Sequence, residues 1–137
     1  MKIVYFTPAV IWFIVSLILL TLPANDLPHS SLFDLPYFDK YVHLGMFFLL
    51  TVLFSYPFSK LTAEDVTISA IFNKIALFII LYGIIMEFVQ KYFTAGRTFD
   101  ITDILFDAVG SVTGLLIMRR LTFKKIGPNK NRGRNQN

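Results

Sequence analysis

The sequence predicts an all-α polytopic membrane protein, with four transmembrane helices in one bundle and both termini in the cytoplasm. The first observation is the composition, because the 137 residues are 55% hydrophobic and only 16% charged, well on the apolar side of a soluble domain of this size. The second is that the apolar residues fall into four runs, each close to the ~20 residues that a spanning helix needs. The third is the distribution of lysine and arginine, which favours one orientation in the membrane.

The first span is predicted over residues 3–22. It contains no charge and is long enough to form ~30 Å of helix. A cleaved signal peptide is the alternative, but Leu22-Pro23-Ala24 is a poor cleavage site, so a retained helix is predicted. Residues 23–38 contain three prolines together with Asn, Asp and Ser, a mixture that is typical of a loop.

The second span is predicted over residues 39–58 and begins with three polar side chains. Asp39 and His43 are four residues apart and share a helix face, and Lys40 lies three residues before His43. These residues form a polar entrance to an otherwise apolar helix. The sequence leaves two roles open for His43, a hydrogen-bond partner of Glu87 or an interfacial histidine.

The third span is predicted over residues 75–93, with Ile68 as an alternative, earlier start. The connection before it, residues 59–73, carries several charges. Thr62 is a suitable N-cap there, so a short interfacial helix is predicted in this connection.

The fourth span is predicted over residues 100–119, after a short polar turn at residues 94–98. The transmembrane domain is therefore predicted over residues 1–120. Residues 121–137 are basic and end in Gly, Pro and Asn. They are predicted to form a disordered cytoplasmic tail that contacts anionic lipid.

The charges select an orientation for the four spans. With both termini in the cytoplasm, the inner segments hold ten of the thirteen Lys and Arg residues, and the outer segments hold only Lys40, Lys91 and Arg97. The positive-inside rule strongly favours this arrangement. A pI of 9.4 could indicate nucleic-acid binding, but the positive charge is a terminal tail after a hydrophobic span, so no nucleic-acid partner is predicted.

Acidic side chains lie within the third and fourth predicted spans, where each costs ~2.5–3.5 kcal/mol near the bilayer centre. Glu87 and Gln90 share a stripe of the third span, and Asp100, Asp103 and Asp107 fall at i, i+3 and i+7 on the fourth. Both stripes meet the start of the second span at the extracytoplasmic face. The candidate residues of this polar site are Asp39, Lys40, His43, Glu87, Gln90, Arg97, Asp100, Asp103 and Asp107.

For three of these residues, a structural role is given the same weight as a ligand-binding role. Arg97 with Asp100 and Asp103 can clamp the start of the fourth helix, where acids suit the positive end of the helix dipole. Asp100 alone is predicted to be an N-cap. Glu87 and Asp107 lie deeper, and a buried acid must be paired, hydrogen-bonded or protonated. A functional role is therefore favoured for these two residues.

The fourth span also carries a packing signal. Gly110 and Gly114 form a small-xxx-small pair that continues the acidic face and lets another helix approach closely. The phenylalanines of the second span, Phe47 and Phe48 among them, are predicted to pack against lipid or the bundle.

Four motifs, taken in this order and spacing, carry a resemblance to a known family: Asp39-Lys40-x-x-His43, Glu87-x-x-Gln90, Arg97-x-x-Asp100-x-x-Asp103 and Gly110-x-x-x-Gly114. They are similar to the VanZ-like family of small bacterial membrane proteins, by motif over about residues 37–116 and by span count over the whole chain. The resemblance implies a multi-pass protein of the bacterial plasma membrane with a polar outer site. The family's namesake is associated with resistance to the glycopeptide teicoplanin. One departure is Asp107, where the family commonly has Asn.

Three functions remain open at this stage. The leading one is binding of a cell-envelope ligand, a lipid headgroup or a glycopeptide antibiotic, with a contribution to antibiotic resistance. The second is a membrane-interface enzyme that acts on a lipid headgroup through Glu87, Asp103 or Asp107 with His43, used as acid–base groups or as oxygen-rich metal ligands. The third is a structural or regulatory membrane subunit whose acids pair with a partner's bases.

The first hypothesis assigns cations and acceptors to different parts of the ligand. Arg97, Lys40 and Lys91 can meet phosphate or carboxylate, while Glu87, Gln90 and Asp103 can meet amide or hydroxyl groups.

The motifs do not establish an enzyme. The sequence has no cysteine, which excludes disulfides, thiolate nucleophiles and cysteine-bound zinc, and it has neither HExxH nor a nucleophile elbow. Four carboxylates with one histidine are not a specific metal signature, so no metal, cofactor or catalytic residue is predicted. The oligomeric state is left open.

Overall fold

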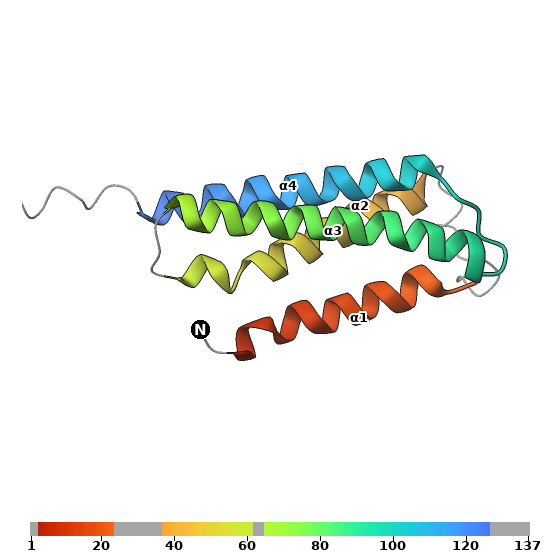
Figure 1. Cartoon of the computed structure of the whole chain (residues 1–137), viewed down its shortest axis with the longest axis horizontal. Helices are drawn as coiled ribbons and strands as arrows, with labels where there is room; N and C mark the ends of the chain where they lie inside the picture. The colour runs from red at the N-terminus through yellow and green to blue at the C-terminus, as the bar shows by residue number, and fades with distance from the viewer. Residues whose placement is uncertain (1–2, 24–36, 62–64, 127–137) are drawn as a thin grey trace, which may run out of the picture.

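A computed structural model of the chain describes residues 3–23, 37–61 and 65–126. Four helices in it are long and apolar enough to cross a membrane (Figure 1). This confirms the all-α, multi-pass fold class. The elements in order are η1 Ile3–Phe6, α1 Thr7–Thr21, α2 Phe38–Ser55, η3 Phe58–Lys60, α3 Asp65–Phe93 and α4 Ile101–Ile126.

Helix α3 is longer than the predicted span, since it begins at Asp65 and runs without a break to Phe93. A separate interfacial helix is therefore wrong for the described part of that connection, and Thr62 lies outside the described residues. The reason is packing, because Ile68 and Phe72 in the early turns are fully buried and form a core cluster with Met118 of α4. Burial of these side chains extends the helix beyond the span predicted at residues 75–93, and even beyond the earlier start at Ile68.

Helix α4 is also longer than predicted and continues to Ile126. The boundary predicted at residue 120 is too early, and residues 121–126 are helical rather than disordered. Thr122 is buried and Phe123 packs against the same core cluster as Met118, so this last stretch belongs to the bundle. The rest of the predicted tail, residues 127–137, lies outside the described residues.

The closest helix packing is between α2 and α4. A Cβ atom on Gly110 would collide with the carbonyl oxygen of Leu44, and one on Gly114 would lie 2.8 Å from the carbonyl oxygen of Phe48. Both glycines therefore let the two backbones touch, as the small-xxx-small pattern predicts. This contact fixes the register of α2 against α4, and with it the register of the polar side chains that the two helices carry.

Helix α1 lies along the side of the other three helices (Figure 1). Two hydrogen bonds tether its middle. The indole nitrogen of Trp12 donates to the carbonyl oxygen of Met46 in α2 at 3.2 Å, and the hydroxyl groups of Ser16 and Tyr82 in α3 lie 3.1 Å apart. Such bonds satisfy polar groups that lipid cannot satisfy.

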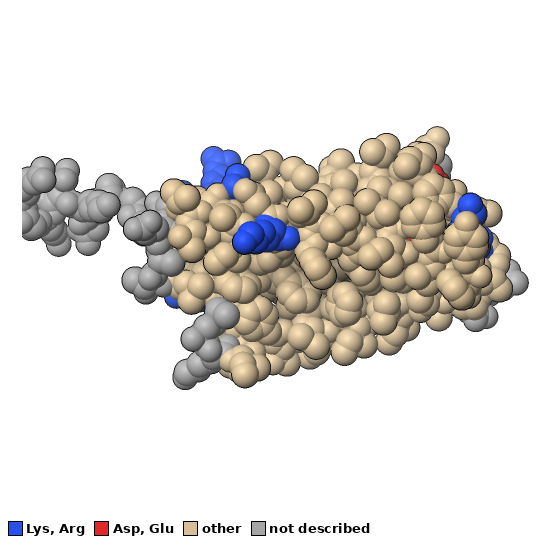
Figure 2. Space-filling view, in the orientation of Figure 1, with Lys and Arg blue, Asp and Glu red and all other residues tan. Residues whose placement is uncertain are grey.

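The described ends of the chain, at Ile3 and Ile126, lie at the same end of the bundle (Figure 1). The opposite end, which we call the polar end, holds the start of α2, the end of α3, the start of α4 and the turn between α3 and α4. Gly96 closes that turn with φ 73°, a left-handed conformation that glycine adopts without strain. Figure 2 shows a largely uncharged side between the two ends, with Lys and Arg toward the ends.

Candidate functional site

The site at the polar end begins with the N-cap of α4. One carboxylate oxygen of Asp100 accepts hydrogen bonds from the backbone N–H of Thr102 at 2.8 Å and from its hydroxyl at 2.6 Å. This is the N-cap geometry that the sequence predicts for Asp100. The other carboxylate oxygen of Asp100 lies 2.7 Å from the ammonium of Lys40, so the same side chain caps α4 and joins it to α2.

Lys40 is the cation that holds the acids of α4. Its ammonium lies 2.8 Å from Oδ1 of Asp103 and 2.7 Å from Asp100, and its side chain is only 11% exposed. Asp39 is at the rim, 3.5 Å from Lys40 and 55% exposed. The sequence assigns the cation of this clamp to Arg97, whereas the structure assigns it to Lys40 in the first turn of α2.

Acid is expected to weaken this clamp. Hydrogen bonds from Lys40 and then from Thr102 lower the pKa of Asp100 from its ordinary 3.8 to about 2. Because the folded pKa lies below the unfolded pKa, the stabilisation is present above about pH 4 and is lost as the pH falls through about 2. Asp100→Asn keeps the N-cap but removes the charge. Its thermal midpoint in detergent should therefore fall less than that of the wild type between about pH 5 and about pH 2, and equal falls would contradict this role for the carboxylate.

His43 and Asp107 form a second, deeper pair between α2 and α4. Nδ1 of His43 lies 2.9 Å from Oδ1 of Asp107, and the two side chains are 5% and 2% exposed. Gly83 of α3 makes room for this pair, because a Cβ atom there would lie 2.6 Å from Oδ2 of Asp107. The ring of Phe47 stacks on His43 with a centroid distance of 6.3 Å. One turn beyond His43 on the same face, Phe47 is thus a wall of the site as well as a packing residue.

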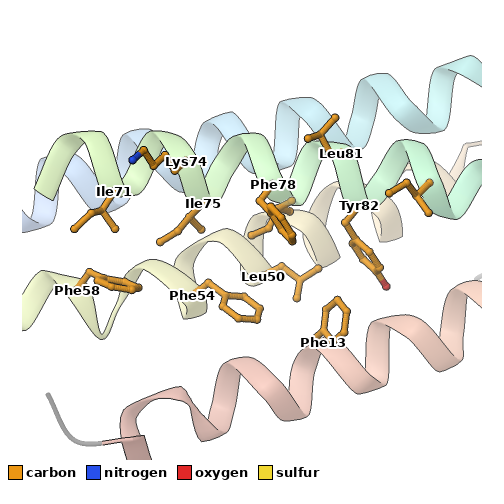
Figure 3. A pocket seen from close by; sticks show the side chains of 12 residues that line it. Phe13, Leu50, Phe54, Phe58, Ile71, Lys74, Ile75, Phe78, Leu81 and Tyr82 are labelled. Atoms are coloured by element: carbon orange, nitrogen blue, oxygen red, sulfur yellow. The ribbon is translucent and has the colours of Figure 1, made fainter. Parts of the chain in front are cut away.

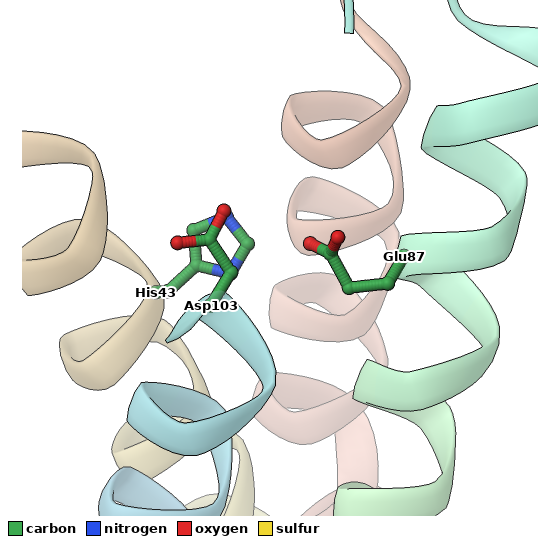
Figure 4. Close-up of side chains that lie close together, drawn as sticks. All are labelled: His43, Glu87 and Asp103. Atoms are coloured by element: carbon green, nitrogen blue, oxygen red, sulfur yellow. The ribbon is translucent and has the colours of Figure 1, made fainter. Parts of the chain in front are cut away.

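Glu87 of α3 completes the cluster and is 1% exposed. Its Oε2 accepts a hydrogen bond from the backbone N–H of Asp100 at 3.0 Å, which ties α3 to the start of α4. Its Oε1 is buried and has no hydrogen-bond partner among the described residues. The carboxylate points toward His43 and Asp103 (Figure 4), and one possible ligand atom from each of the three side chains lies within 4.8 Å of the others.

Two predicted members of the site and one further predicted phosphate contact lie apart from these side chains. Gln90 is buried but donates to the carbonyl oxygen of Leu20 at 3.0 Å, so it fastens α1 to α3. Arg97 is half-buried, and its Nε has no hydrogen-bond partner among the described residues. Lys91, a predicted phosphate contact, lies over the rings of Tyr92 and Phe99 at 5.1 and 5.8 Å.

We refer to His43, Glu87, Asp103 and Asp107 as the acidic cluster. His43 is neither an interfacial histidine nor a hydrogen-bond partner of Glu87. The residue is buried, and its hydrogen-bond partner is Asp107. Gly83 lies one turn before Glu87 on the same face of α3. A glycine one turn before a buried acid in a helix indicates, from the sequence, that a side chain of a neighbouring helix can fit there.

The acidic cluster and its clamp carry excess negative charge. Glu87, Asp100, Asp103 and Asp107 supply four carboxylates, and Lys40 supplies one ammonium. When all are ionised and His43 is neutral, these side chains carry three excess negative charges. Excess charge of this kind is expensive in a buried setting and calls for protons, a cation or a cationic part of a ligand.

The fold and this cluster define a class: a small four-helix polytopic membrane protein that keeps buried acids and a histidine at one end of its bundle. The sequence matches the VanZ/LLP1 family over residues 2–123. The chain therefore belongs to that family, which confirms the resemblance carried by the four motifs and is consistent with a bacterial membrane protein linked to antibiotic resistance. A search of curated proteins and a search of solved structures each gave no match.

Proposed function

We propose that this protein binds the headgroup of a cell-envelope lipid at the extracytoplasmic face of the membrane and contributes to antibiotic resistance through that binding. The observation that carries the proposal is Oε1 of Glu87, which is buried beside His43 and Asp103 and accepts no hydrogen bond from the part of the chain that the structure describes. A headgroup hydroxyl or amide supplies the hydrogen-bond donor that this oxygen lacks.

An apolar groove supports a lipid as the ligand. It has a volume of about 720 Å³ and is formed between α1, α2 and α3 (Figure 3). Its walls are aromatic and aliphatic, including Phe13, Phe54 and Phe78, and Tyr82 and Ile85 are at one end. Along α3 that end lies ~3–8 Å before Glu87, so an acyl chain in the groove places its headgroup near the acidic cluster.

The cations outside the clamp support the same ligand class. Arg97 follows the turn after α3 and keeps an unpartnered Nε among the described residues, whereas the ammonium of Lys40 is already held by aspartates. A guanidinium binds phosphate with two parallel hydrogen bonds. Arg97 is therefore the phosphate contact in this proposal, and the acidic cluster receives the uncharged polar groups.

Lipid binding tests the proposal directly. Purified protein in nanodiscs is loaded with bacterial envelope lipids, and bound species are counted by native mass spectrometry. Arg97→Ala should lose at least tenfold in affinity for phosphate-bearing lipids. Arg120→Ala is the matched control, because Arg120 is an exposed arginine at the other end of the bundle. Equal binding by wild type and Arg97→Ala shows that Arg97 is not part of the site.

Teicoplanin is added as a competitor. Displacement of lipid by teicoplanin indicates a glycopeptide ligand, and unchanged lipid binding indicates a lipid ligand.

The extracytoplasmic location makes a separate prediction. Since the sequence has no cysteine, single-cysteine variants can be labelled without background. Ala95→Cys in the turn after α3 should react with a membrane-impermeant maleimide in intact cells, and Lys60→Cys in η3 should react only after lysis. Both positions are exposed. The reverse pattern would place the polar end in the cytoplasm.

A second candidate is acid–base catalysis on the bound headgroup. The His43–Asp107 hydrogen bond favours it, because an aspartate that orients a buried histidine fixes which ring nitrogen can exchange a proton. Incubation of the protein with envelope lipids, followed by mass spectrometry of the lipids, tests this function. Turnover that is lost in His43→Gln supports it, and unchanged lipids leave binding as the function.

A further inference from the structure

We propose that His43, Glu87 and Asp103 bind a divalent transition-metal ion of the Zn²⁺ or Mn²⁺ type. The three residues are 4%, 1% and 8% exposed, and they come from α2, α3 and α4. Their possible ligand atoms lie within 4.8 Å of one another. A tetrahedral ion at ~2.0–2.2 Å from each atom holds the ligand atoms ~3.3–3.6 Å apart, so the side chains need to close by up to about 1.5 Å, which small rotations of the three side chains can supply.

The free carboxylate oxygen of Glu87 points to a ligand independently of this spacing. Its neighbour Oε2 is held by the backbone N–H of Asp100 at 3.0 Å, while Oε1 is buried without a hydrogen-bond partner among the described residues. Figure 4 shows the carboxylate of Glu87 aimed at the side chains of His43 and Asp103. A metal ion between the three side chains satisfies this oxygen.

Asp107 positions the histidine for this role. The 2.9 Å contact between Nδ1 of His43 and Oδ1 of Asp107 makes Nδ1 the donor when Asp107 is ionised and leaves the lone pair of Nε2 for the ion. Histidine ligands of metals commonly donate their other ring N–H to a carboxylate, which fixes the tautomer and the ring orientation. Asp107 is therefore a positioning residue rather than a ligand.

Charge and ligand type select the ion. When Glu87, Asp100, Asp103 and Asp107 are ionised and His43 is neutral, these four acids exceed Lys40 by three charges, and a divalent ion reduces this excess to one. One imidazole with two carboxylates suits Zn²⁺ or Mn²⁺, whereas Mg²⁺ and Ca²⁺ prefer oxygen ligands throughout. Lys40 contacts Oδ1 of Asp103, which leaves Oδ2 of that carboxylate for the ion.

The ion also explains how an acidic site accepts an anionic headgroup. This part of the inference rests on the proposed function: the bound ion contacts a hydroxyl or amide oxygen of the headgroup and offsets the carboxylates that would otherwise repel the phosphate held by Arg97. The metal site itself does not depend on the lipid and is tested without it.

The test uses full-length protein with a histidine-free affinity tag. The protein is stripped with chelator, dialysed against Zn²⁺ or Mn²⁺, and analysed by plasma mass spectrometry. Wild type should bind about one ion per chain. His43→Gln and Glu87→Gln should bind at least tenfold more weakly, and Asp107→Asn roughly 10–100-fold more weakly. His29→Gln is the matched control, because His29 is the other of the two histidines in the chain, and it should bind like the wild type.

Equal binding by wild type and His43→Gln, or no binding above the detergent blank, overturns the metal site. If a variant fails to fold, the Co²⁺ spectrum of the wild type decides instead. Intense visible bands of a four- or five-coordinate ion support the site, and the weak spectrum of hydrated Co²⁺ contradicts it. Lipid binding that survives chelation overturns the bridging role and leaves the proposed function in place. Metal binding without lipid binding overturns the proposed function and leaves the metal site in place.

Discussion

Gly110→Ala is expected to destabilise the protein more than any other single-methyl change, by about 1–3 kcal/mol or more. The added Cβ would collide with the backbone carbonyl of Leu44 and lie 3.0 Å from the backbone nitrogen of Phe48. Backbone atoms cannot rotate away as a side chain does, so α2 and α4 must separate. Separation also moves Lys40 and His43 away from the acids of α4, and ligand binding should fall together with stability.

Gly45→Ala is the matched control for this prediction. A Cβ at Gly45 has no heavy atom within 4 Å, and the residue lies on the exposed side of α2. Alanine is the better helix former, so this variant should keep or raise stability by up to about 1 kcal/mol. The measurement is loss of helical signal on heating in detergent. Similar midpoints for the two variants would contradict the close α2–α4 contact.

Lys40→Met is expected to have the second large effect. It removes the cation between Asp100 and Asp103 and leaves the carboxylate of Asp103, whose side chain is 11% exposed, without its partner. Removing one member of a buried ion pair costs ~3–5 kcal/mol, because the remaining charge stays buried. The share from Asp100 is small, since its side chain is 39% exposed and solvent screens it.

A double variant separates charge from packing. Lys40→Met combined with Asp103→Asn removes both charges and should recover most of the lost stability, because two neutral groups replace an unpaired carboxylate. Lys124→Met, at an exposed lysine of α4, should change the unfolding midpoint little. If the double variant is no more stable than Lys40→Met, the aliphatic stem of Lys40 rather than its charge holds the helices together.

The sequence predicts the four spans, the N-cap at Asp100 and the gathering of polar residues at one end, because hydropathy, turn chemistry and helical periodicity are local properties. The residue at which α3 begins depends on contacts with residues that are distant in sequence. Ile68 and Phe72 become helical core through contact with Met118, a residue that is distant in sequence.

The pairings within the site depend on how the helices are rotated about their axes. Arg97 is close in sequence to the start of α4, whereas Lys40 is 60 residues from Asp100. The register of α2 against α4 nevertheless selects Lys40 as the clamp. Likewise, His43 meets Asp107 rather than Glu87 because Gly83 leaves space for the aspartate between α2 and α3. A glycine pattern indicates that helices approach closely, but it does not specify which side chains then face each other.

The central claim is that the acidic cluster is a ligand site rather than a structural clamp, and Glu87→Gln tests it most directly. The amide keeps the acceptor for the backbone N–H of Asp100 and removes one buried negative charge. The measurement is the unfolding midpoint of the variant in the same nanodiscs, with and without envelope lipid. The account predicts an unliganded midpoint equal to or above that of the wild type, and little or none of the rise that lipid produces in the wild type. A lowered unliganded midpoint with the lipid-induced rise intact would show that Glu87 serves the fold and not the ligand.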